Sequence, residues 1–163
     1  MKNITIRKIT DEERPWAKKF LTGHWGSPII IVHGQQYSAD ELSALVAVDE
    51  NSEKIGLLTY DIHEGDCQIV TLNSIVEKEG VGKKLIIGAK NIAIDNYCKR
   101  LWLITTNDNM EALKYYQKFG FSICAIRINE IENSRKFKPQ IPKKGLHDIP
   151  IRDEIELEYF INQ

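Results

Sequence analysis

The stretch Glu77-Lys78-Glu79-Gly80-Val81-Gly82-Lys83-Lys84-Leu85 places two glycines directly before a helical repeat of apolar residues. Glycines at this position let the backbone turn tightly and approach a ligand closely, because no Cβ stands in the way. The start of the helix adds partial positive charge at the same place. The stretch therefore predicts an anion-binding loop at the N-terminus of a helix.

Spacing argues against the two best-known phosphate loops. A Walker loop needs a glycine five residues before Gly82 and a Ser or Thr after its lysine, where this chain has Glu77 and Lys84. The dinucleotide fingerprint needs Gly or Ala three residues after Gly82, where this chain has Leu85. A nucleotide phosphate-binding protein is therefore disfavoured.

The residues after the loop alternate between helix and strand patterns. Apolar residues recur at helical spacing from Leu85 to Tyr97, and a short apolar run rich in strand formers follows from Leu101 to Thr106. Helical spacing resumes at Met110 and stops at Gly120, and Phe121 to Ile126 returns to a strand pattern. This order of elements is typical of an α/β arrangement.

The glycine loop and a second block, Asn109-x-x-Ala112-x-x-Tyr115-Tyr116-x-Lys118-x-Gly120-Phe121, together resemble the GCN5-related N-acetyltransferase (GNAT) superfamily. In that family the loop cradles the pyrophosphate of acetyl-coenzyme A (acetyl-CoA), and the second block lines the pantetheine arm. The resemblance covers the middle of the chain by motif and the rest by element order. One departure is Glu77, where the family usually has Gln or Arg, so binding would rest on backbone N–H groups and Lys83.

The resemblance implies the GNAT fold, an α+β architecture of three layers, α/β/α. A mixed, mostly antiparallel sheet of about seven strands carries helices on both faces. Thr10 to Leu21 is predicted as a helix with Pro15 in its first turn, and Ser38 to Glu41 as a turn. The remaining strands are predicted at Ile4 to Ile9, Ile29 to Val32, Leu45 to Asp49, Lys54 to Ile62 and Cys67 to Ile75.

The composition of the chain limits the number of domains and the kinds of binding partner. The 163 residues, 42% hydrophobic, suffice for one domain, 1–163. The net charge of -1 gives no basic character, so no nucleic-acid partner is expected. We expect no membrane association and a cytoplasmic location, because no long apolar or signal-like segment occurs. A homodimer is possible, as among relatives. Cys67, Cys98 and Cys124 lack metal-ligand spacing and are expected to be buried, reduced thiols, with no metal bound.

The resemblance also assigns cofactor contacts. The strand before the glycine loop is expected to bulge, and a backbone N–H at Leu72 or Asn73 is expected to polarise the thioester carbonyl. The full set of assigned cofactor residues is Leu72, Asn73, Ile75, Glu79, Gly80, Val81, Gly82, Lys83, Asn109, Ala112, Tyr115 and Tyr116.

Acetyl transfer to an amine needs a base, because a free alkylamine has a pKa of about 10 and is protonated at neutral pH. It also needs a proton for the departing thiolate. The resemblance places Tyr116 near the thioester sulfur as the general acid, and the alternative is an aromatic residue that only packs on the sheet. Many family members carry the base on the strand before the loop, but this chain has Gln68 and no carboxylate between Asp66 and Glu77.

The segment from Ile149 to Tyr159 offers another base. Alternation puts Ile155, Leu157 and Tyr159 on a core face, and Arg152, Glu154, Glu156 and Glu158 on the opposite face. Either this acidic face is solvated, or Asp153 or Glu154 at the strand entrance orients or deprotonates a cationic acceptor.

Two further segments bear on the acceptor. His24 and Trp25, between Gly23 and Gly26, are candidate substrate residues in a predicted loop. The sequence favours the alternative that His24 is a surface histidine and Trp25 a core or staple residue. Asn129 to Ile149 is predicted as a long basic connection.

The sequence predicts an acyltransferase that moves an acetyl group from acetyl-CoA to a primary amine of a small molecule or peptide by direct attack. The missing carboxylate on the strand before the loop keeps one alternative open, a non-catalytic acyl-CoA-binding or sensor module.

Overall fold

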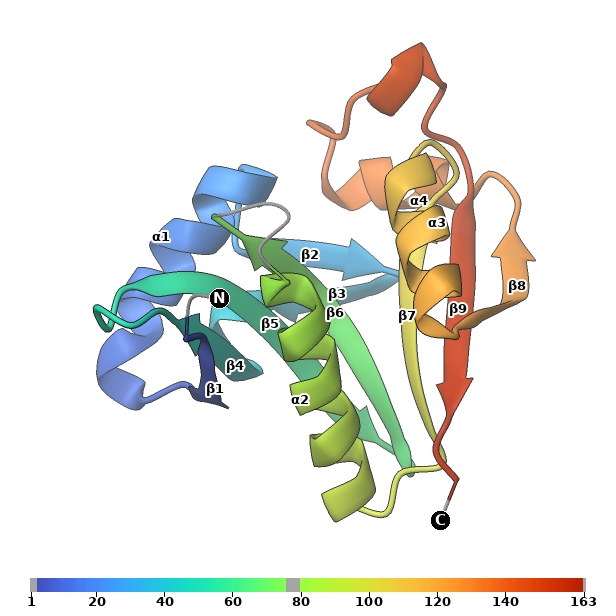
Figure 1. Cartoon of the computed structure of the whole chain (residues 1–163). Helices are drawn as coiled ribbons and strands as arrows, with labels where there is room; N and C mark the ends of the chain where they lie inside the picture. Colours follow the sequence, from blue (N-terminus) through green and yellow to red (C-terminus); the bar gives the residue numbers. More distant parts are fainter. Residues whose placement is uncertain (1–2, 76–79, 163) are drawn as a thin grey trace. The chain divides into compact units, whose positions relative to one another are not determined.

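The computed structural model describes residues 3–75 and 80–162. Residue contacts group the chain into two compact units. The first unit comprises Met1–Ile30, Tyr37–Leu101 and Ile161–Gln163, and the second comprises Ile31–Gln36 and Trp102–Phe160. The elements of both are labelled in Figure 1. A single-domain organisation stays a prediction, and each unit is described by itself.

The main sheet has seven strands, hydrogen-bonded in the order β1-β4-β5-β6-β7-β9-β8. The pairs β1–β4, β4–β5, β5–β6 and β8–β9 are antiparallel, which confirms the predicted fold class. The strands are β1 (Thr5–Lys8), β4 (Ser43–Val48), β5 (Lys54–His63), β6 (Asp66–Ser74), β7 (Arg100–Thr106), β8 (Ser122–Arg127) and β9 (Glu154–Phe160).

A separate two-stranded hairpin lies between the first helix and β4. It consists of β2 (Ile29–Val32) and β3 (Gln35–Ser38). The first of these strands was predicted, but β3 was not, because Gln35-Gln36-Tyr37-Ser38 shows no apolar alternation.

The α-helices are α1 (Arg14–Trp25), α2 (Val81–Asp95), α3 (Met110–Phe119) and α4 (Glu130–Phe137). The short 3-10 helices are η1 (Asp11–Glu13), η2 (Ala39–Glu41) and η3 (Leu146–Asp148). Within the residues that the structure describes, no helix is both long and apolar enough to span a membrane.

Three predictions need correction. The first helix continues through Gly23 to Trp25 and ends at Gly26, which has a φ of 75°. The connection from residue 129 to 149 was predicted as a loop but contains α4 and η3. Tyr97 follows the end of α2 and is 81% exposed, so it does not belong to the helix's apolar face.

The cysteines agree with their prediction in two cases of three. Cys67 and Cys98 are buried and free, and burial raises the pKa of Cys67 to about 12. Cys124 is exposed rather than buried, because it lies on β8, the last strand in the order of the sheet.

In the first unit, α2 packs against β1, β4, β5 and β6 (Figure 1). Gly56 of β5 permits close approach, since a Cβ there would lie only 2.7 Å from Cγ1 of Val81. Leu57 points to the opposite face, and Asn73 of β6 is its cross-strand partner. Asn73 Oδ1 accepts a hydrogen bond of 2.7 Å from Nε1 of Trp25, so α1 ends on the face opposite α2.

In the second unit, α3 packs against β8, and the ring of Phe121, between these elements, meets the rings of Phe119 in α3 and Tyr159 in β9. Gly120 ends α3 with a φ of 114°, and the ring centroids of Phe121 and Tyr159 lie 5.6 Å apart. The buried Arg135 of α4 holds the chain before β9, because its Nη2 donates to the carbonyls of Pro142 and Ile151. These contacts fix the path of the chain into β9.

The start of α1 is fixed by an ion pair whose pH dependence can be tested. Arg7 donates to both carboxylate oxygens of Glu13, at 2.8 and 2.7 Å, and the Thr10 N–H donates to Oε2 at 3.0 Å. The hydrogen bonds from Arg7 lower the pKa of Glu13 from 4.5 to about 2.

We expect Glu13→Gln to lower the free energy of unfolding by about 1 kcal/mol at pH 7, a modest loss because Arg7 is partly exposed. Since the folded-state pKa is depressed, the contribution is complete above pH 4.5 and disappears as the pH falls toward 2. Urea unfolding across this range measures the difference. Glu12→Gln, at the exposed neighbouring residue, is the control and should cost little at any pH. A loss at Glu13 that does not change with pH would contradict the account.

Candidate active site

The N-terminus of α2 has the geometry predicted for an anion-binding loop. Gly80 is the N-cap in a left-handed conformation, with a φ of 78°. The first helical bond runs from the Lys84 N–H to the Gly80 carbonyl, at 3.1 Å, so the N–H groups of Val81, Gly82 and Lys83 precede it and have no acceptor within the helix. They lie at the positive end of the helix dipole. Glu77 and Glu79 lie outside the described residues.

The two lysines of this loop lie differently. Lys84 Nζ donates to the Ile4 carbonyl at 3.1 Å, which ties it to the chain before β1. Lys83 is exposed beside the helix start. Of the two, Lys83 is therefore the cation that can meet an anion at the loop.

The strand before the loop bulges. Thr59 and Tyr60 of β5 pair with Thr71 and Ile69, which leaves Val70 of β6 as the additional residue. The expected bulge therefore lies at Val70, two residues before Leu72.

The backbone of β6 distinguishes the two thioester candidates. The Ile75 N–H donates to the Ile55 carbonyl of β5 at 2.8 Å, and hydrogen-bonded pairs alternate along an antiparallel ladder. The N–H of Asn73 therefore points toward β5, whereas that of Leu72 points away from it. This alternation favours Leu72 as the N–H donor to a carbonyl.

The N-terminus of α3 is capped by the side chain of Asn109. Asn109 Oδ1 accepts a hydrogen bond of 3.1 Å from the Ala112 N–H. This bond occupies the side-chain oxygen of Asn109 and orders the first turn, where Ala112 lies.

Tyr115 and Tyr116 follow on α3 in different environments. Tyr116 is only 9% exposed and meets the rings of Tyr115 and Phe121 edge-on, with both centroid distances 5.5 Å. Tyr115 is 39% exposed. Burial raises the pKa of both phenols, most strongly for Tyr116, which therefore stays protonated and able to donate.

His24 and Trp25 lie in the last turn of α1 rather than in the predicted loop. His24 Nδ1 lies 2.9 Å from the Phe20 carbonyl oxygen, and Trp25 Nε1 bonds to Asn73. His24 lines an apolar cavity of about 440 Å³ together with Trp16, Lys19, Phe20, Gly23 and Ile75. The structure brings His24 to a cavity and gives Trp25 a structural contact.

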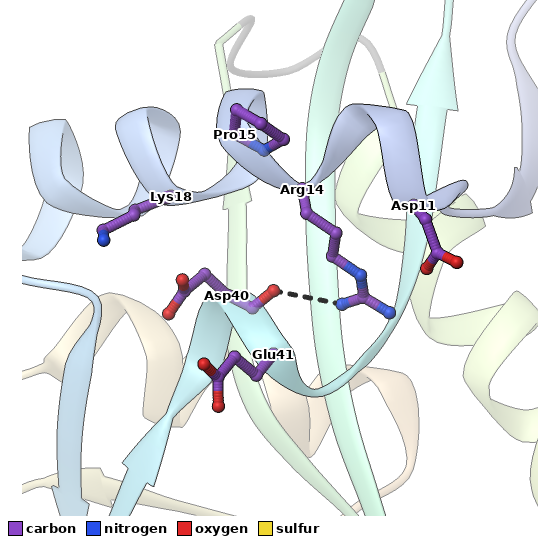
Figure 2. A pocket seen from close by; sticks show the side chains of 6 residues that line it. All are labelled: Asp11, Arg14, Pro15, Lys18, Asp40 and Glu41. Atoms are coloured by element: carbon purple, nitrogen blue, oxygen red, sulfur yellow. Dashed lines mark hydrogen bonds between the residues drawn. The ribbon is translucent and has the colours of Figure 1, made fainter.

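A second cavity, of about 510 Å³, lies between α1 and η2 (Figure 2). Arg14 donates to the backbone carbonyls of Asp40, at 3.1 Å, and Leu42, so its guanidinium is directed at the backbone. The remaining lining residues are Asp11, Pro15, Lys18 and Glu41. Side chains of both signs line this cavity, and Arg14 connects α1 to the segment around η2.

Asp153 is committed to structure. Its Oδ1 accepts from the Asn129 N–H at 2.8 Å and from Arg152 Nε at 2.9 Å. The hydrogen bonds from Arg152 lower the pKa of Asp153, so it stays ionised and is a weak base. Its backbone N–H donates to Asn107 Oδ1 at 3.0 Å.

Glu154 differs sharply from its neighbour. It is 2% exposed, and Oε1 accepts a hydrogen bond of 3.0 Å from the His33 N–H. Among the described residues, its Oε2 has no hydrogen-bond partner. Burial raises the pKa of Glu154, the charge of Glu130 raises it further, and the His33 bond and the charge of Arg127 oppose them. A carboxylate in this state is a strengthened base.

The first part of the acidic face of β9 is therefore buried and not exposed to solvent. Glu154 and Glu156 are 2% and 6% exposed, which excludes that interpretation for these two residues.

The hairpin tip that covers Glu154 was missed from the sequence. His33 and Gly34 both have positive φ, 49° and 71°, as in the two-residue turn of a tight hairpin. The glycine at the second turn position was the available signal, but the polar β3 strand hid the hairpin. Among residues 3–75 and 80–162, no three His, Cys, Asp or Glu side chains form a group that could hold a metal ion.

Comparison with known proteins relates this geometry to a family. Residues 10–121 match the Acetyltransferase (GNAT) family. The uncharacterised protein YdhI of Bacillus subtilis (strain 168) is 40% identical over 136 residues, which is 83% of this chain and 85% of YdhI.

Two solved structures share the fold over nearly the whole chain. An IAA acetyltransferase from Bacillus cereus has a TM-score of 0.75 at 21% identity, covering 98% of this chain and 100% of that chain. A GNAT family acetyltransferase from Elizabethkingia anophelis, with acetyl-CoA bound, has a TM-score of 0.71 at 23% identity, covering 98% and 99%. With the family match spanning most of its length, the chain belongs to the GNAT family of acetyltransferases.

Proposed function

We propose that the protein transfers the acetyl group of acetyl-CoA to a primary amine of a small molecule or peptide, with Glu154 as the general base. The observation that carries the proposal is the buried Glu154 carboxylate, whose Oε2 has no partner among the described residues. Burial keeps the group basic, and no donor among the described residues competes for Oε2. Asp153, bound by Arg152, lacks both properties.

The transfer balances in one direct step. The acceptor ammonium gives a proton to Glu154, and the freed nitrogen lone pair attacks the thioester carbonyl carbon. The N–C bond forms, the C–S bond breaks, and the sulfur leaves as a thiolate. The acylated nitrogen then loses its second proton to this thiolate, which gives the amide and the free thiol of CoA. Glu154 then returns its proton to solvent.

Acetyl-CoA supplies the activated thioester as a cosubstrate. We assign its pyrophosphate to Glu79, Gly80, Val81, Gly82 and Lys83, where the first N–H groups of α2, which have no acceptor within the helix, support anion binding. Leu72, Asn73 and Ile75 are assigned to the thioester and pantetheine, with Leu72 as the preferred N–H donor. The remaining proposed contacts are Asn109, Ala112, Tyr115 and Tyr116 on and before α3.

Replacing Glu154 by Gln removes the base but keeps an oxygen for the His33 N–H. We expect kcat/KM to fall by about 10²-fold or more at neutral pH. In the wild type, kcat/KM should rise with pH through an apparent pKa above 4.5, because burial raises the pKa of this carboxyl, and this limb should disappear in the variant. Thiol release from acetyl-CoA with an amine panel, read across pH, measures both effects.

Two controls separate chemistry from folding. The raised folded-state pKa means that ionised Glu154 destabilises the fold above that pKa, so Glu154→Gln should not lower the melting temperature at pH 7. Asp153→Asn should lower stability but keep the pH-dependent limb. A normal pH profile in Glu154→Gln would exclude it as the base.

Tyr116→Phe tests the proposed acid. A phenol with a raised pKa is a poor proton donor at equilibrium but a constant hydrogen-bond donor, which stabilises a departing thiolate. We expect kcat to fall by about 10- to 100-fold with little change in acetyl-CoA affinity, measured by steady-state kinetics and calorimetry. Tyr115→Phe, on the more exposed ring, is the matched control. Equal kcat in Tyr116→Phe and the wild type would leave Tyr116 only a packing role.

The same assays address a non-catalytic acyl-CoA sensor. The observation favouring it is Gln68, which lies on β6 where many relatives carry the base and which accepts a hydrogen bond from Tyr37. Tight acetyl-CoA binding without turnover of any amine would establish the sensor. Absence of acetyl-CoA binding would exclude both functions.

A further inference from the structure

A second unsatisfied group lies opposite Glu154, at the end of the neighbouring strand β8. In the antiparallel pairing of β8 and β9, Arg127 is the cross-strand partner of Glu154, so both side chains lie on the same face. Glu156 lies two residues along β9 on that face. Opposite charges in this register normally pair directly.

The two partners do not bind each other. Arg127 Nη2 reaches diagonally to Glu156 Oε2 at 2.5 Å, whereas Glu154 Oε1 takes the His33 N–H. Within the described residues, this leaves Arg127 Nη1 and Glu154 Oε2 buried and without hydrogen-bond partners. A donor and an acceptor on facing residues are thus both unsatisfied, a costly arrangement that a stable core avoids.

The charges around the pair favour a particular ligand. Glu130 interacts electrostatically with Glu154, and Glu156 is engaged with Arg127. With these acidic groups present, a simple anion is disfavoured and a cation is favoured. A plain alkylamine would satisfy Glu154 Oε2 and leave Arg127 Nη1 without an acceptor. A group that satisfies both must carry a cationic donor and an oxygen acceptor close together.

We propose that the acceptor is an α-amino acid, whose ammonium donates to Glu154 Oε2 and whose carboxylate accepts from Arg127 Nη1. This inference rests on the proposed function, because it names the amine that Glu154 deprotonates. The carboxylate is preferred to a neutral carbonyl because guanidinium–carboxylate hydrogen bonds are charge-assisted. Arg127 is then a specificity-determining residue, and it takes no part in the proton transfer.

Matched acceptor pairs test the proposal on the intact wild-type protein. Each α-amino acid is compared with the amine that it would give on decarboxylation, such as leucine with isoamylamine, phenylalanine with phenethylamine and lysine with cadaverine. For at least one pair we expect kcat/KM to be about 10- to 100-fold higher for the amino acid. The amide of that amino acid should fall between them.

Variants then assign the preference to Arg127. Arg127→Met should abolish the preference, measured as the ratio of kcat/KM for the amino acid to kcat/KM for its plain amine. The ratio is the readout because the charge of Arg127 also acts on the pKa of Glu154. Arg127→Lys keeps a charge for Glu156, so it serves if the Met variant does not fold, and it should reduce the preference. Arg100→Met is the matched control, because Arg100 is equally exposed, at 23%, and also forms an ion pair with a carboxylate, that of Asp66. It should retain the full preference.

The outcomes separate this inference from the proposed function. Turnover of plain amines with no preference for any amino acid would overturn the inference and leave the acetyltransferase intact. If no acceptor is turned over, calorimetry on the CoA-saturated protein decides. Tighter binding of an amino acid than of its decarboxylated partner, lost in Arg127→Met, would support the inference. Equal or absent binding would overturn it.

Discussion

The burial of one carboxylate, Glu154, is the constraint on which the chemistry that we propose for the second unit depends. A buried carboxylate is costly unless its oxygens are satisfied, and here the protein satisfies only one, with the backbone N–H of His33. The other oxygen retains its basicity. The hairpin tip, β8 and the start of α4 all interact with Glu154. The rest of the fold must therefore offset the unfavourable free energy of burying this group.

The neighbouring residues explain how the position of this carboxylate is held. Asn107 at the end of β7 accepts hydrogen bonds from the N–H groups of Arg152 and Asp153. Asp108 accepts from the Leu146 N–H at 3.0 Å, and Arg135 binds the carbonyl of Ile151. These hydrogen bonds hold the backbone of the segment that leads into β9. They therefore fix the point at which β9 begins. The pKa values of two adjacent carboxyls are thus shifted in opposite directions by their surroundings.

Much of the fold was predictable because its signals are local or belong to recognisable motifs. The glycines at Gly80 and Gly82 and the Asn109 to Phe121 block indicated the family, and with it the sheet; Gly120 ended α3 as expected. The errors arose where tertiary contacts decide. The predicted first helix ends at Leu21, whereas α1 continues to Trp25, and the polar helix α4 lies in a segment predicted as a loop. The burial of Glu154 depends on a hairpin tip 121 residues away in the chain, which no periodicity reports.

The proposal that Glu154 is a strengthened base is tested by measuring the pKa of its carboxyl group. Carboxyl ¹³C NMR, with the resonance assigned by its loss in Glu154→Gln, follows this group alone across pH. We expect the pKa of Glu154 to lie above the ordinary 4.5 and the pKa of Asp153 to lie below its ordinary value in the same spectra. A Glu154 resonance that titrates at or below 4.5 would contradict the account.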